Sequence, residues 1–261
     1  MLKYPSFLGG YFCLSYFCSV LFNYYTMIEI KNVTFGYNKY CNVLQDFSLQ
    51  FKKGGVYGLL GKNGTGKSTL LYLMMGLLRP KQGEVRIDGV LASKRLPEMM
   101  QEIFIVPEEY DLPRISLRKY VNSLKPFYPH FSTELLVRCL SGFDMSPELD
   151  LGSLSMGQRK KVYICIALAT NTQYLLMDEP TNGLDILSKS QFRKVVIEGM
   201  SEDKTIIIST HQVHDVERML DHVCIIGPNK VLLDAPLVET DEPIDLEKLF
   251  IETLTNKKVE E

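Results

Sequence analysis

The distribution of apolar residues along the chain predicts a series of short strands. In residues 28–35 apolar and polar positions alternate, which is typical of a strand with one buried face. Residues 174–177 form a short continuous apolar run, as expected of a strand covered on both faces. Similar signals predict further strands at 43–51, 56–60, 84–87, 103–106 and 205–209. The opening strands follow one another like a hairpin, which predicts an antiparallel layer near the N-terminus.

Helical patterns fill most of the stretches between these strands. They predict helices at 67–76, within 116–142, up to about 170, at 188–199 and near 213–220. Pro126 and Pro129 divide the second stretch into two helices, and Ser132 is a good N-cap for the later one. Alternating strands and helices predict an α/β fold with a mainly parallel sheet and helices on both sides. No internal repeat divides the chain.

The first 26 residues do not fit this pattern. From Tyr4 to Thr26 there is no charged residue, and the stretch is long enough to span a bilayer as a helix. A signal peptide is disfavoured because no small-x-small cleavage site follows the apolar run. The strand pattern begins directly after Met27, which favours a translation start at that methionine. A membrane anchor is the alternative, and mass spectrometry of the native N-terminus distinguishes the two.

Composition and charge exclude several classes of function. The formal net charge of −2 gives no electrostatic support for a nucleic-acid partner, which usually demands a basic surface, so no such partner is expected. The cysteines form no C-x-x-C pair, so neither a zinc site nor a redox motif is predicted. Buried thiols in a reducing compartment explain the cysteines best.

The segment from Gly61 to Ser68 reads G-K-N-G-T-G-K-S, which fits the phosphate-binding loop G-x-x-x-x-G-K-[ST] in full. It follows a predicted strand and precedes a predicted helix, the context in which such a loop works. Its glycines let backbone N–H groups turn toward phosphate oxygens. Lys67 supplies a charge to the β- and γ-phosphates, and the Ser68 hydroxyl is a Mg²⁺ ligand. The loop alone predicts a nucleotide, without saying which reaction follows.

Two carboxylates, Asp178 and Glu179, end the buried strand at 174–177. Ligands gather at the carboxyl ends of strands in open α/β sheets. Asp178 is placed to hold Mg²⁺, and Glu179 is placed to act as general base on a water that attacks the γ-phosphate. Without the phosphate loop, a solvated turn would be the better explanation of the pair.

Further motifs appear in a fixed order. Residues 154–158 read L-S-M-G-Q, and residues 180–185 continue from Glu179 as P-T-N-G-L-D. His211 follows the strand at 205–209, and Tyr37 lies 30 residues before Lys67. In this order the motifs resemble the signature, D-loop, switch histidine and adenine-stacking aromatic of ABC transporter ATP-binding subunits. The resemblance covers about residues 27–236 and implies the P-loop NTPase fold with a small helical subdomain at about 110–165.

The resemblance implies an ATPase with ATP and Mg²⁺ as cofactors and with the following sites. Catalysis is expected at Glu179 and His211, and the metal ligands at Ser68, Glu108 and Asp178. Nucleotide contacts are expected at Tyr37, Gly61, Asn63, Gly64, Gly66, Lys67, Ser68, Thr69, Ser155, Gly157, Gln158 and Asp185. Three of these features also have a purely structural explanation. Tyr37 could be a packed strand aromatic, His211 an ordinary loop histidine, and residues 154–158 a helix N-cap.

The resemblance also implies partners and a location. Two ATP-binding subunits pair head to tail, here as a homodimer, with ATP between the loop of one and the signature of the other. A separate transmembrane permease completes the transporter, which places this chain peripherally on the cytoplasmic side of the cell membrane. Three features resemble the ABC-2 exporter branch of the family: the shortness of the helical lobe, residues 127–131 within it, and residues 246–250 near the C-terminus. Residues 237–261 are expected to form a C-terminal extension.

Two positions depart from the family pattern. Glu108 stands where the family has glutamine, and Met156 replaces the first glycine of the signature. A carboxylate at Glu108 adds negative charge near the phosphates, which predicts an altered metal dependence with hydrolysis retained. The alternative functions are a soluble ABC ATPase without a transport role and a nucleotide-binding module that does not turn over. Glu179 and His211 argue against the second alternative.

Overall fold

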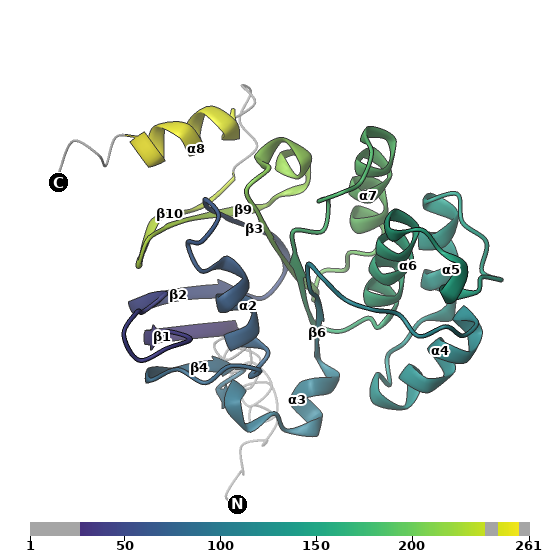
Figure 1. The fold of residues 1–261 in the computed structure, drawn as a ribbon, viewed down its shortest axis with the longest axis horizontal. Helices are drawn as coiled ribbons and strands as arrows, with labels where there is room; N and C mark the ends of the chain where they lie inside the picture. The colour runs from purple at the N-terminus through teal and green to yellow at the C-terminus, as the bar shows by residue number, and fades with distance from the viewer. Residues whose placement is uncertain (1–26, 238–244, 256–261) are drawn as a thin grey trace, which may run out of the picture.

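The computed structural model describes residues 27–237 and 245–255, and Figure 1 shows the fold. Residues 1–26, for which a late translation start was predicted, lie outside the described part, as do residues 238–244 and 256–261 of the predicted C-terminal extension. Within the described ranges, no helix has the length and apolar character needed to cross a membrane.

A six-stranded sheet forms the centre of the molecule. Its strand order is β10-β9-β3-β8-β7-β6, and every neighbouring pair is parallel except β9 with β10. The strands are β3 (Gly55–Leu60), β6 (Ile103–Val106), β7 (Tyr174–Asp178), β8 (Thr205–Thr210), β9 (His222–Gly227) and β10 (Lys230–Pro236). Leu60 pairs with Thr210, and Asp178 pairs with Ser209. This register brings the carboxyl ends of β3, β7 and β8 to one edge of the sheet.

A smaller antiparallel sheet confirms the predicted N-terminal layer. Its order is β2-β1-β4-β5, with β1 (Met27–Phe35), β2 (Leu44–Lys52), β4 (Gln82–Ile87) and β5 (Val90–Leu91). Helix α2 (Lys67–Met74) lies between this sheet and the central one (Figure 1). One apolar core fills the space around α2 and contains Tyr174 and Leu176 of β7.

Four more helices cover the opposite face of the central sheet (Figure 1). They are α4 (Leu117–Leu124), α5 (Thr133–Gly142), α6 (Met156–Ala169) and α7 (Ile186–Glu198), while short α3 (Pro97–Gln101) leads into β6. Their core contains Leu175 and Met177, so successive residues of β7 enter different cores. This explains its unbroken apolar run. Ser132 accepts a hydrogen bond from the N–H of Leu135 and caps α5, as the sequence predicts.

The helix predicted near 213–220 is wrong, because two 3₁₀ turns stand there, Val213–Asp215 and Glu217–Met219. The N–H groups of Val216 and Met219 donate to the carbonyl oxygens three residues earlier, at Val213 and Val216, which is the 3₁₀ bonding pattern. The prediction also omitted β5, β9, β10, α3 and the C-terminal helix α8 (Leu246–Thr255). Other short 3₁₀ turns occupy Ala92–Lys94, Lys125–Phe127 and Leu151–Ser153.

Candidate nucleotide site

The predicted phosphate loop connects β3 to α2 and encloses the side chain of Lys67. Gly64 and Gly66 have φ values of 83° and 97°, a left-handed conformation that favours glycine. The Lys67 ammonium donates hydrogen bonds to the carbonyl oxygens of Gly61 (2.9 Å) and Lys62 (3.3 Å). Lys67 is only 6% exposed. The loop therefore holds a buried positive charge at its centre, as a phosphate cradle requires.

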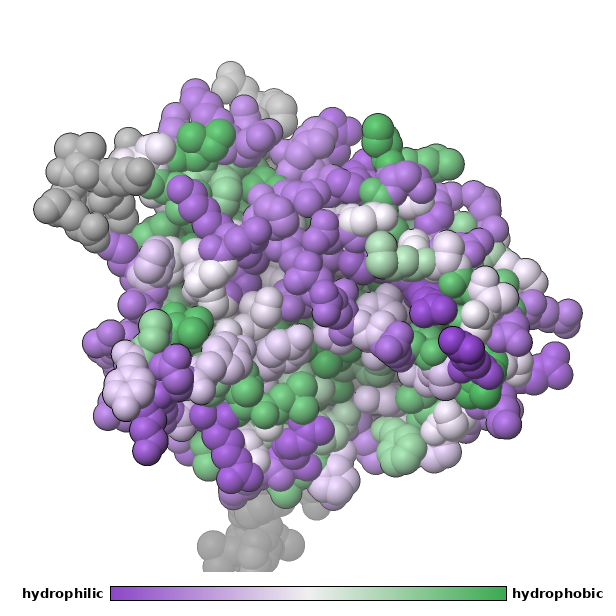
Figure 2. Space-filling model, viewed as in Figure 1, coloured by the Kyte–Doolittle hydropathy of each residue, from purple (hydrophilic) through white to green (hydrophobic). Residues whose placement is uncertain are grey.

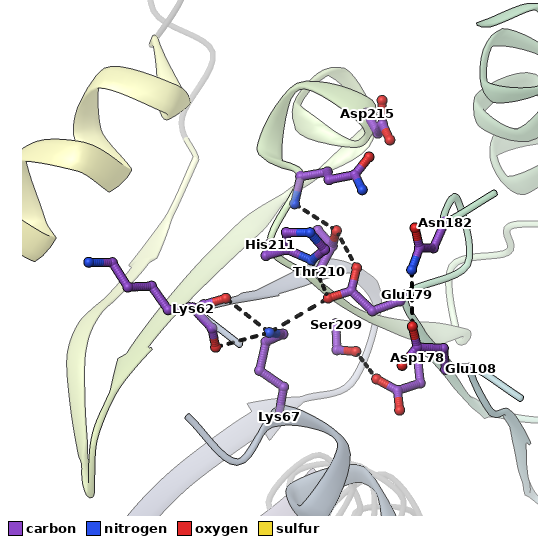
Figure 3. A network of polar contacts seen from close by, with 12 residues as sticks. Lys62, Lys67, Glu108, Asp178, Glu179, Asn182, Ser209, Thr210, His211 and Asp215 are labelled. Atoms are coloured by element: carbon purple, nitrogen blue, oxygen red, sulfur yellow. Dashed lines mark hydrogen bonds and ion pairs between the residues drawn. The ribbon is translucent and has the colours of Figure 1, made fainter. Parts of the chain in front are cut away.

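Asp178 and Glu179 meet that loop from the end of β7 (Figure 3). Glu179 Oε1 lies 3.6 Å from Lys67 Nζ, and its Oε2 accepts a hydrogen bond from the Thr210 hydroxyl at 3.0 Å. His211 Nδ1 lies 2.8 Å from Glu179 Oε1. Glu179 has φ 44°, an uncommon backbone conformation that is often found at functional positions. Four residues from three segments thus form one polar network.

Burial shifts the protonation of two members of this site. Desolvation lowers the pKa of Lys67, against the attraction of Glu179 and Asp178, which favours the charged form. Desolvation raises the pKa of Asp178, while hydrogen bonds from Ser209 and Ser68 act in the opposite direction. The site thus holds buried charges whose desolvation is only partly offset. A polyanion with its counter-ion would satisfy both.

A cleft of about 380 Å³ opens above this network. It brings together ten of the predicted site residues: Tyr37, Asn63, Gly64, Gly66, Lys67, Ser68, Thr69, Glu108, Glu179 and His211. Val43 and Asn182 complete the lining, and the predicted site residues included neither. Gly61 and Asp178 are buried beneath the cleft. The Tyr37 ring is 65% exposed, and its hydroxyl is hydrogen-bonded to Thr69 Oγ1 at 3.1 Å.

A profile of the family described as "ABC transporter" matches residues 44–182. NatA, an ABC transporter ATP-binding protein of Bacillus subtilis, is 32% identical over 226 residues, covering 83% of this chain and 92% of NatA. The lantibiotic transport ATP-binding protein SrtF of Streptococcus pyogenes is 30% identical, with 86% of this chain and 96% of SrtF covered. The chain belongs to the ABC transporter ATP-binding family.

The fold agrees with this assignment. A solved ATP-binding subunit of an ABC transporter superposes with a TM-score of 0.76 at 25% identity, covering 88% of this chain and all of that one. The chain is therefore a nucleotide-binding ABC ATPase domain of the P-loop type. ABC ATPases hydrolyse ATP, and their ATP-binding subunits work with transmembrane permeases.

The ABC signature segment lies outside this subunit's cleft. Ser155 Oγ accepts a hydrogen bond from the N–H of Gln158, and Gln158 Oε1 accepts one from the N–H of Ser155, which is a complete capping box. The structure thus confirms the predicted N-cap. A side chain added at Gly157 would meet nothing within 4 Å, and Met156 is 81% exposed. The start of α6 is therefore an open surface.

The D-loop is tied to both α6 and Glu108. The Lys160 ammonium donates to the carbonyl oxygens of Glu179 (3.1 Å) and Asn182 (2.8 Å). The Asn182 amide donates to Glu108 Oε1 at 3.0 Å (Figure 3), so one oxygen of that carboxylate already has a partner. Asp185, predicted as a nucleotide contact, caps α7 through the N–H and hydroxyl of Ser188 and does not line the cleft.

Proposed function

We propose that this chain is the ATP-hydrolysing subunit of an ABC exporter, with the cleft above Lys67 as its catalytic site. The observation that supports the site most directly is the network of Lys67, Glu179, Thr210 and His211. These residues come from the phosphate loop, the end of β7 and the end of β8. Lys67 and the loop N–H groups would bind the β- and γ-phosphates, and the exposed Tyr37 ring would stack on adenine.

Glu179 is the proposed general base. Its carboxylate would accept a proton from the water that attacks the γ-phosphorus, giving ADP and inorganic phosphate. Its partner His211 would hold the carboxylate in place and contact the γ-phosphate. The Glu179 carboxylate lies 3.6 Å from the Lys67 ammonium. Bound phosphates would compete for that ammonium and free the carboxylate for its catalytic role.

Mg²⁺ fits the oxygen donors that lie beside the loop. Ser68 supplies a hydroxyl at the cleft, and the buried Asp178 supplies a carboxylate hydrogen-bonded to Ser209 and Ser68. Hard oxygen ligands and substrate phosphates are what Mg²⁺ prefers. When bound, the ion neutralises phosphate charge, and Asp178 and Ser68 hold its position. Glu108 lines the cleft and would act at the edge of this shell.

The proposed active unit is a head-to-tail homodimer. Ser155 and Gly157 do not line their own cleft, although hydroxyl and N–H groups at a helix start suit a phosphate. Met156, Ile186 and Leu187 are exposed apolar side chains at the starts of α6 and α7. Figure 2 shows such apolar side chains at the surface over α7, beside a largely hydrophilic middle of this face. A second copy would cover them and supply the missing phosphate contacts.

The proposed partner is a separate permease on the cytoplasmic side of the membrane. The catalytic domain would extend over residues 27–236, with the helical subdomain at about 110–165 transmitting its movement to the permease. SrtF is named for lantibiotic transport, which favours export. The methionine import ATP-binding protein MetN of Carboxydothermus hydrogenoformans is 31% identical, so sequence similarity alone does not give the direction of transport. The proposal of export therefore rests on the short helical lobe as well. Uptake and efflux assays with the co-purified permease test it.

The decisive experiment compares Glu179→Gln with the wild-type chain. ATPase turnover should fall by about 10²–10⁴-fold because the base is lost, while binding of a fluorescent ATP analogue stays intact. Lys67→Ala should abolish binding itself. Glu109→Gln is the matched control, since Glu109 is an exposed acid that does not line the cleft. Wild-type turnover in Glu179→Gln would refute the catalytic assignment, and size-exclusion chromatography with ATP tests the dimer.

A further inference from the structure

Three chemically different donor groups meet on one face of the β9–β10 ribbon. His222 and Cys224 are two residues apart in β9, so their side chains project from the same face. Asp234 of β10 pairs directly with Cys224 in the antiparallel register. Directly opposed residues share a face, so the register brings imidazole, thiol and carboxylate together. These three residues are called the hairpin triad below.

The distances within the hairpin triad are those of a compact ligand set. His222 Nε2 lies 2.7 Å from Asp234 Oδ1, and Cys224 Sγ lies 3.1 Å from the same oxygen. All the donor atoms lie within 4.8 Å of one another. Four-coordinate zinc, with bonds of about 2.0–2.3 Å, places its ligand atoms about 3.3–3.8 Å apart. Shifts of about 1 Å or less would convert the present contacts into coordination.

Burial gives the hairpin triad an enclosed side and an open side. Cys224 is fully buried in the core between the two sheets, whereas the side chains of His222 and Asp234 are 24% and 41% exposed. An ion can therefore enter past His222 and Asp234 and reach the sulfur. The Tyr57 ring lies against the His222 ring, with centroids 4.9 Å apart, and holds the imidazole in orientation.

We infer that His222, Cys224 and Asp234 bind one Zn²⁺ ion, with water as the fourth ligand. Imidazole, thiolate and carboxylate are all zinc ligands, and thiolate disfavours Mg²⁺, which prefers oxygen. Binding forms Zn–N, Zn–S and Zn–O bonds and releases the Cys224 thiol proton to solvent. One thiolate and one carboxylate balance the charge of the ion. The ion would cross-link β9 to β10 at the edge of the central sheet.

The hairpin triad is distinct from the nucleotide site. His222 pairs with Tyr57, whereas the phosphate loop begins after Leu60, which pairs with Ile225. Three residues of strand separate the two levels, or about 10 Å. Cysteine spacing could not predict this site, because its ligands are a single cysteine and two residues that only the strand register brings near it. A failure of the zinc proposal would therefore leave the proposed ATPase function unaffected, and the reverse also holds.

The test is a titration of the tag-free full-length protein with Co²⁺ and then Zn²⁺, in the absence of nucleotide. One equivalent of Co²⁺ should produce the thiolate-to-cobalt charge-transfer band and the intense visible bands of a four-coordinate ion, and Zn²⁺ should remove both. Cys224→Ser should eliminate the charge-transfer band. His222→Gln, at a partly exposed position, should weaken binding by at least about 100-fold with an unchanged circular dichroism spectrum.

Two controls separate the hairpin triad from the other thiols. Cys41→Ser removes an exposed thiol, and the double variant Cys13→Ser/Cys18→Ser removes the N-terminal pair. Both should retain the complete cobalt spectrum at one equivalent. The inference is overturned if the wild-type chain gives no charge-transfer band, or if the band survives Cys224→Ser. It is equally overturned if folded His222→Gln binds Co²⁺ as tightly as the wild type.

Discussion

Lys204 is a buried lysine that stabilises the ends of two helices. Its ammonium donates to the carbonyl oxygens of Gly199 (2.7 Å) and Leu168 (3.4 Å), next to the C-termini of α7 and α6. The residue is only 2% exposed. Desolvation lowers its pKa from 10.5 to about 8. Its protonation state therefore differs between the folded and the unfolded chain over an accessible pH range.

The sign of the effect follows from the order of the two pKa values. Below pH 8 both states carry the proton on Lys204, and the cost of burying the charge is fully present. Between pH 8 and 10.5 the unfolded chain binds more protons, so the free energy of unfolding rises with pH. From pH 7 to pH 9.5 linkage gives a rise of about 2 kcal/mol from this residue alone.

The perturbation that tests this is Lys204→Met, which keeps the length of the side chain and removes its titration. Urea unfolding at pH 7 and pH 9.5 gives the free energy of unfolding of each protein. The quantity to compare between the two pH values is the free energy of the wild type minus that of the variant. This difference should increase by about 2 kcal/mol at the higher pH, because other titrating groups cancel in it. Lys194→Met, which removes an exposed lysine of α7, should show no such change. A difference that is constant with pH would refute the reasoning.

Three further variants test local features. Glu108→Gln removes a negative charge that faces the cleft, so ATPase activity should persist but require more Mg²⁺ for half-saturation; superimposable curves would contradict a role in the metal shell. Ser132→Ala deletes the cap of α5 and should lower the free energy of unfolding by about 1 kcal/mol, measured by urea denaturation; an unchanged midpoint would show that the cap is dispensable. Gly66→Ala places a side chain at φ 97° and should cost about 1–3 kcal/mol of stability and weaken nucleotide binding, whereas unaltered binding would argue against a strained loop.

The parts of the site that are local in sequence could be predicted, because their residues are adjacent along the chain. The phosphate loop from Gly61 to Ser68 and the pair Asp178–Glu179 are of this kind. The partners of Glu179 could not be derived in the same way, since Thr210 and Lys67 approach it only through the order of β3, β8 and β7. Similarly, no sequence pattern joins Asn182 to Glu108 across 74 positions.

The fold was predictable where the pattern was long or clearly bounded. Strand β3, which precedes the phosphate loop, and the helices α2, α5 and α6 have strong apolar patterns and clear caps or turns. β9 was missed, although residues 223–226 form an apolar run that could have indicated it. β10 gave a weaker signal, because it is an edge strand and its residues are only half-buried. The buried positions at 213–220 suit an α-helix as well, so the apolar pattern could not predict the 3₁₀ turns there.

The position of Lys160 has a mechanical consequence. Lys160 lies in α6, the helix that begins at the signature, and its ammonium donates hydrogen bonds to two carbonyl oxygens of the D-loop. Burial lowers the pKa of Lys160, and the ammonium is half-enclosed, so losing either bond would leave charge poorly solvated. A tilt of α6 that broke these contacts would raise the free energy of the protein. A tilt in which the D-loop moves together with the helix keeps both hydrogen bonds and is therefore favoured. We therefore expect the backbone of Glu179 to move together with the start of α6.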